Sequence, residues 1–75
     1  MANQSIGKQI QERREQLNMN SAQLAQKSGM NLDWLLMVET DRWFSVTLVG
    51  LDNIARALSC QIVSEKSSLQ LVPNA

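Results

Sequence analysis

The sequence contains no histidine and a single cysteine, Cys60, among its 75 residues. The absence of histidine excludes His-dependent acid–base catalysis and histidine metal sites. One cysteine forms neither an internal disulfide nor a multi-cysteine metal site, so we interpret Cys60 as a small buried hydrophobe. A glycine-rich phosphate-binding loop is missing too. The sequence therefore predicts no enzyme, no cofactor, no metal site and no small-molecule substrate.

Long apolar runs are also missing. No apolar stretch approaches the ~20 residues of a membrane-spanning helix, so we expect no membrane contact. The N-terminal stretch MANQSIGKQI has no uninterrupted apolar block, which predicts that it is not a secretion signal. We therefore expect a cytoplasmic protein.

Neither sign of charge is in excess, because seven Lys and Arg balance seven Asp and Glu. Compact nucleic-acid binders usually carry a basic excess, since phosphate neutralisation supplies much of their affinity. A neutral chain can still bind DNA if its basic groups gather on one face. The charge balance lowers the expectation of DNA binding without removing it.

The length allows one small hydrophobic core and no more. Hydrophobic residues make up 44% of the chain, which is typical of a folded globular protein and argues against disorder. A domain of 75 residues is only marginally stable alone, so we expect a homodimer that buries additional surface.

Helical periodicity begins after Ser5, which is a good N-cap residue. Ile6, Ile10 and Leu17 fall on one helical face, and this stripe predicts a helix over about residues 6–17.

Two shorter helices are predicted next, separated by Gly29. Asn20 caps a helix over residues 21–28, and Gly29 follows it where a left-handed backbone favours glycine. Asn31 caps a third helix that runs to about Thr40. Their inward residues are Leu24, Ala25, Leu35, Val38 and Glu39.

The outward face of the third helix is unusual in composition. At roughly 100° per residue, Asp33, Leu36 and Met37 lie opposite the inward face, with Leu32 and Trp34 on its flanks. This face combines apolar side chains with one acid.

The rest of the chain changes character twice. The stretch TDRWFSV breaks the periodicity and predicts a loop, after which Thr47 caps a fourth helix. The segments CQIVS and LQLV predict either a hairpin or a strand that pairs with another chain. We divide the chain into a helical domain, residues 1–59, and a strand-like tail, residues 60–75, as a possible dimerisation element. The inward residues of the fourth helix are Leu48, Leu51, Ile54, Ala55 and Leu58.

Four stretches carry a family resemblance: IGKQIQERREQL, LAQKSG, the glutamate that ends LLMVE, and LVGLDNIARAL. Together they resemble Cro/C1-type helix-turn-helix regulators of the XRE family over about residues 6–58. The resemblance implies an all-α, lambda-repressor-like fold of four to five short helices, followed by a short strand or hairpin. It also implies a DNA-binding transcriptional repressor. The tail is similar in layout to HipB-type antitoxins, in which a short strand joins two subunits.

The same resemblance implies an ion pair between Arg14 and Glu39, because family members pair an arginine of the first helix with a glutamate of the third. Periodicity also requires a partner for the inward-facing Glu39. On periodicity alone, Arg13 and Arg14 remain equal candidates.

The resemblance also implies which residues face DNA. Family members usually place a glutamine where Ser21 stands, and amide, hydroxyl or basic groups at the base-reading positions, so this chain departs from the pattern. The expected phosphate contacts are Ser21, Gln23, Lys27 and Arg42. The expected base-reading residues are Leu32, Asp33, Leu36 and Met37.

The apolar residues at the base-reading positions favour a second interpretation. In it, the outward face of the third helix binds a protein such as a toxin or an activator. The simpler interpretation of Trp34 and Phe44 is that they fill the core, whereas Leu36 and Met37 point away from it. The residues expected at a partner or dimer surface are Trp34, Trp43, Phe44, Ile62, Val63, Leu69 and Leu71.

Overall fold

The computed structural model describes residues 5–42, 48–65 and 68–74. These residues form four helices followed by one antiparallel hairpin, which confirms the predicted fold class. The elements are α1 (Ile6–Gln16), α2 (Ser21–Ser28), α3 (Leu32–Glu39), α4 (Leu48–Ala57), β1 (Cys60–Glu65) and β2 (Ser68–Pro73). No helix in the described ranges is long and apolar enough to cross a membrane.

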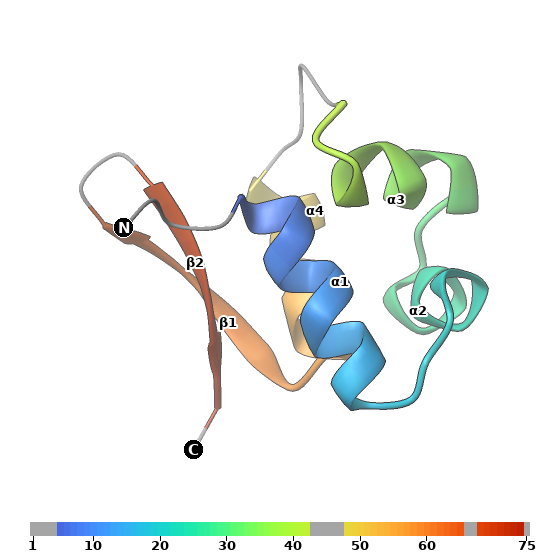
Figure 1. Cartoon of the computed structure of the whole chain (residues 1–75), viewed down its shortest axis with the longest axis horizontal. Helices are drawn as coiled ribbons and strands as arrows, with labels where there is room; N and C mark the ends of the chain where they lie inside the picture. The colour runs from blue at the N-terminus through green and yellow to red at the C-terminus, as the bar shows by residue number, and fades with distance from the viewer. Residues whose placement is uncertain (1–4, 43–47, 66–67, 75) are drawn as a thin grey trace.

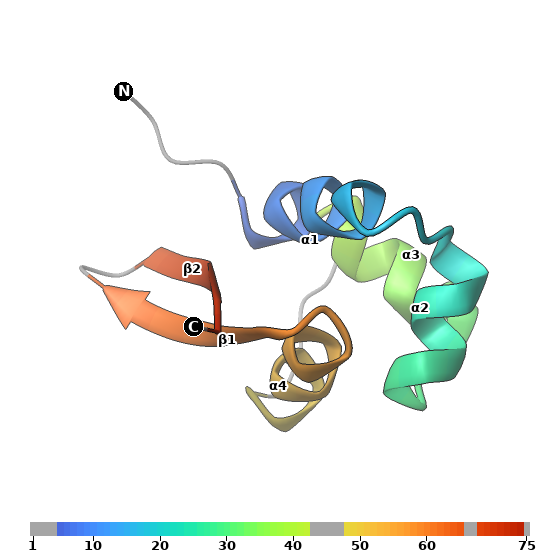
Figure 2. The ribbon, with the colours of Figure 1, turned by 90° about the horizontal axis from the view of Figure 1, so that it is seen from below.

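The elements are arranged in three layers. In Figures 1 and 2, α1 and α4 lie between the hairpin on one side and the α2–α3 pair on the other. Each outer layer therefore packs against a central pair of helices, and the outer surface of α3 is far from the hairpin.

The helix ends follow the predicted caps. The Ser5 hydroxyl accepts a hydrogen bond at the start of α1, and the Asn20 carboxamide forms a capping box at the start of α2. Gly29 ends α2 with a φ of 72°, and Asn31 caps α3. Thr47, the predicted cap of α4, lies outside the described residues.

The core is formed by the inward faces of all four helices and by Cys60 at the start of β1. Leu17, which the sequence placed on the apolar face of the first helix, is 37% exposed, because α1 ends at Gln16 and Leu17 forms its C-cap. The side chain of Leu48 is outside the described part of the chain. The buried apolar residues are Ile6, Ile10, Leu24, Ala25, Leu35, Val38, Leu51, Ile54, Ala55, Ala57, Leu58 and Cys60.

The hairpin pairs within the chain and packs on α1. Ile62 lies opposite Leu71 in the register, and the side chains of Ile62, Leu69 and Leu71 contact the core. The Gln9 side chain donates to the Leu69 carbonyl at 3.2 Å and accepts from the Leu71 N–H at 2.8 Å. An isolated hairpin is marginally stable in water, so this attachment to α1 stabilises it. Val63 lies on the opposite face of the hairpin because side chains alternate along a strand.

Gly7 allows α1 to approach the end of α3 closely. A Cβ atom at this position would meet the Val38 carbonyl oxygen, with Asp41 Oδ1 at 2.6 Å and the Glu39 carbonyl oxygen at 2.9 Å. Two of these three atoms belong to the backbone and cannot move aside cheaply.

We predict that Gly7→Ala lowers the free energy of unfolding by about 1–3 kcal/mol, because α1 must shift away from α3. Urea denaturation measures the change. Lys8→Ala, at the exposed neighbouring position, should stay within about 0.5 kcal/mol of the parent protein. A Gly7→Ala protein as stable as the parent would show that the gain in helix propensity outweighs the close packing.

Candidate nucleic-acid interface

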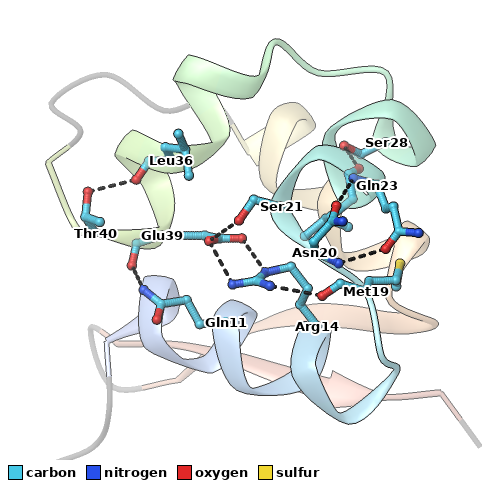
Figure 3. A network of polar contacts seen from close by, with 11 residues as sticks. Gln11, Arg14, Met19, Asn20, Ser21, Gln23, Ser28, Leu36, Glu39 and Thr40 are labelled. Carbon is cyan, nitrogen blue, oxygen red and sulfur yellow. Dashed lines mark hydrogen bonds and ion pairs between the residues drawn. The ribbon is translucent and has the colours of Figure 1, made fainter.

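A buried ion pair connects α1 to α3. Glu39 is 3% exposed, and Arg14 approaches it with two nitrogens: Nε donates to Oε2 at 3.0 Å and Nη2 donates to Oε1 at 3.3 Å. The third guanidinium nitrogen donates to the Met19 carbonyl at 3.0 Å. Figure 3 shows the guanidinium lying between Glu39 and the Met19 carbonyl. This two-pronged geometry fixes orientation as well as distance.

Arg13, the other candidate for this pair, has a different role. Its Nε donates to the Leu58 carbonyl at 3.2 Å, which connects α1 to the end of α4. The two neighbouring arginines therefore hold α1 to two different helices.

Ser21 joins the same carboxylate. Its hydroxyl donates to Glu39 Oε1 at 3.2 Å, so the first residue of α2 is connected to the last residue of α3 (Figure 3). The sequence predicted Ser21 as a phosphate contact. In the structure, the Ser21 hydroxyl proton is already donated to Glu39. The backbone N–H of Ser21, at the start of α2, is the group that could still bind an anion.

A three-residue turn sets the angle between α2 and α3. Gly29 has the left-handed conformation, and the Met30 N–H donates to the Ala25 carbonyl at 2.9 Å. The Asn31 side chain then accepts from the Asp33 N–H at 2.8 Å and starts α3. Each step uses a residue suited to its local backbone.

The outward face of α3 is exposed. Leu32, Leu36 and Met37 are 38%, 41% and 38% exposed, and Asp33 is exposed beside them. Leu35 and Val38 on the opposite face are fully buried. The helix therefore separates a face that belongs to the core from a face that is open to a partner.

Two basic residues lie next to this face in the chain. Lys27 is in the last turn of α2, and the Arg42 backbone N–H donates to the Met37 carbonyl at 2.9 Å, just beyond α3. Both are exposed, and neither forms a salt bridge with a described residue. Gln23 is exposed as well, although its Oε1 accepts from the Asn20 N–H at 2.8 Å in the capping box.

The other predicted partner residues do not join this face as a group. Trp34 is half-buried and packs against the core, which agrees with its simpler interpretation. Trp43 and Phe44 lie outside the described residues. Ile62, Leu69 and Leu71 pack on the core of their own chain and leave Val63 as the outer hairpin candidate. No group of three or more acidic or cysteine residues that could hold a metal ion occurs in the described ranges.

Sequence reasoning missed the contacts that hold the end of α3. The Gln11 side chain donates to the Glu39 carbonyl, and the Ser5 hydroxyl donates to Asp41 Oδ2 at 2.6 Å. Gly7, Gln11 and Arg14 stand at i, i+4 and i+7, so they form one stripe of α1. In the sequence, the spacing of this glycine and these two polar residues beside the apolar stripe could have indicated a contact between α1 and another helix.

The turn and the two helices around it, held by α1, define a helix-turn-helix fold. Among solved structures, a chain of the SinR protein/SinI protein complex is similar, with a TM-score of 0.67 at 23% sequence identity. The match covers 71% of this chain and 52% of that chain, so this chain spans about half the length of the solved one. No family model and no curated protein matches the sequence. The likeness thus concerns the fold.

We predict that Glu39→Ala lowers the free energy of unfolding by about 3–5 kcal/mol, because it leaves the Arg14 charge buried without its partner. Glu39→Gln removes the charge with little change in shape and should also destabilise the protein. The exposed Asp52–Arg56 pair on α4 provides the control, and Asp52→Ala should cost less than about 1 kcal/mol. Urea denaturation compares the variants. Equal effects of Glu39→Ala and Asp52→Ala would contradict the structural role of the buried pair.

Proposed function

We propose that the chain is a DNA-binding transcriptional regulator that inserts α3 into the major groove. The observation that carries the proposal is the division of α3 into a locked inner face and an open outer face. A helix that reads base edges needs both properties: a fixed orientation and an outer surface free of its own protein.

The dimensions of α3 support this proposal. An α-helix with its side chains is about 10–12 Å across, and the major groove is about 12 Å wide. The eight residues of α3 span about 12 Å along the helix axis. Leu32, Asp33, Leu36 and Met37 are the residues that would meet base edges.

Lys27, Arg42 and Gln23 would meet phosphates beside the groove. With so few cations on a neutral chain, one copy would bind weakly. We therefore propose that two copies bind together, on half-sites about one helical turn apart. Occupying a promoter in this way would repress transcription.

We predict that Lys27→Ala and Arg42→Ala each reduce the salt dependence of binding to duplex DNA. Losing one phosphate contact lowers the slope of log K against log[salt] by about 0.9. Titration of the duplex at a series of salt concentrations measures the slope. Arg56→Ala, which removes an exposed cation already paired on α4, should leave it unchanged. Binding no tighter than about 10⁻⁴–10⁻⁶ M, the range of non-specific contacts, would overturn the proposal.

A second candidate function is binding of a protein partner through the outer face of α3. The observation that favours it is the exposure of Leu32, Leu36 and Met37 together, because exposed apolar groups are common at protein interfaces. The solved structure similar to this chain contains two named proteins in complex. A toxin or an activator would be a partner of this kind.

The two functions predict different outcomes for Met37→Arg. If α3 enters the groove, the new guanidinium strengthens binding to duplex DNA, by about 1–3 kcal/mol where it meets a guanine. Val49→Arg adds the same charge at a 71% exposed position of α4 and is the matched control. Fluorescence anisotropy with labelled duplex compares both variants with the parent. A gain no larger for Met37→Arg than for Val49→Arg would favour the protein-binding function.

A further inference from the structure

The open face of α3 presents carbon rather than hydrogen-bond donors. Leu32, Leu36 and Met37 carry no polar group capable of a strong hydrogen bond, and Asp33 only accepts when ionised. Thr40, just beyond the helix, donates its hydroxyl to the Leu36 carbonyl at 2.8 Å. The side chains that usually read purines, through paired donors to guanine or amides to adenine, are therefore missing from this face.

Only one apolar group is available on base edges in the major groove. This is the C5-methyl group of a pyrimidine, carried by thymine and, after modification, by cytosine. A carboxylate finds its best donor in the N4 amine of cytosine, because the N6 amine of adenine stands beside the N7 acceptor, which repels it. The chemistry of this face therefore matches pyrimidines.

We propose that α3 recognises DNA through pyrimidine C5-methyl groups, which Leu32, Leu36 and Met37 contact, while Asp33 accepts a hydrogen bond from a cytosine N4 amine. This inference rests on the proposed function and specifies what the helix reads. Thymine and 5-methylcytosine share the required methyl group, and the experiment below separates them.

The spacing of the side chains suits a short run of successive base pairs. Leu32 and Leu36 are four residues apart, or about 6 Å along the helix axis. Base pairs follow each other at about 3.4 Å, so these two side chains are about two steps apart in the groove. Met37 lies one residue beyond Leu36. The face therefore covers a run of about three base pairs.

The basic residues that precede and follow α3 in the chain favour DNA over an apolar protein surface as the occupant. Lys27 before α3 and Arg42 after it are exposed and form no salt bridge with a described residue. Basic side chains near an apolar strip complement the phosphates that border a line of methyl groups.

The experiment begins with the full chain and a library of random DNA duplexes, from which the preferred sequence is selected. A duplex of the selected sequence is then synthesised with deoxyuridine in place of thymidine, one position at a time. Each replacement removes only the C5-methyl group. Binding should weaken about fourfold for each contacted methyl group, the equivalent of burying one such group. Replacing a contacted thymine by 5-methylcytosine, with guanine opposite, tests whether the methyl group or the base is read.

Variants of the protein locate the contact. Leu36→Ala and Met37→Ala should bind the thymine and uracil duplexes with more nearly equal affinity, because the side chain that meets the methyl group is gone. Val49→Ala shortens an exposed apolar side chain on α4 and should keep the full discrimination. Circular dichroism should show the parent fold in all three, because the replaced side chains are exposed.

The outcomes separate this inference from the proposed function. Weaker binding to the uracil duplex that disappears in Leu36→Ala or Met37→Ala supports the inference. Sequence-specific binding that is indifferent to every thymine methyl group overturns the inference and leaves the proposed function standing. If no duplex is bound beyond non-specific affinity, both fail and the face belongs to a protein partner.

Discussion

The buried Glu39 carboxylate is the constraint on which the rest of the helical domain depends. A charge at 3% exposure is tolerated because Arg14 approaches it with two nitrogens and Ser21 adds a third donor. These donors come from α1 and α2, whereas the carboxylate ends α3. One side chain therefore connects three helices, and it does so with directional bonds that an apolar contact would not provide.

The first helix contacts both outer layers of the structure. Its stripe of Gly7, Gln11 and Arg14 contacts the end of α3, and Gln9 binds the backbone of β2. Arg13 reaches α4. The hairpin and the α2–α3 pair consequently lie on opposite sides of the central helices, as Figure 2 shows.

Local features of the fold could be predicted from the sequence, because their causes lie within a few residues. The caps Ser5, Asn20 and Asn31 and the buried faces of the helices follow from periodicity and side-chain chemistry. The contact of Gln9 with β2 spans about sixty residues of chain and leaves no mark on local pattern. Ser21 shows the same limit at the site: its residue type suits a phosphate and a carboxylate equally, and only the approach of Glu39 decides.

The apolar character of the open face has no explanation within the fold. Leu36 and Met37 point away from the core, and glutamine, lysine or arginine would support the helix about as well at these positions. Polar side chains there would also improve solubility, since exposed apolar groups favour association. A group of exposed apolar side chains on one helix face is also typical of a surface that contacts another molecule. The composition of this face can therefore change without disturbing the fold, while Glu39 and its donors from α1 and α2 hold α3 in place.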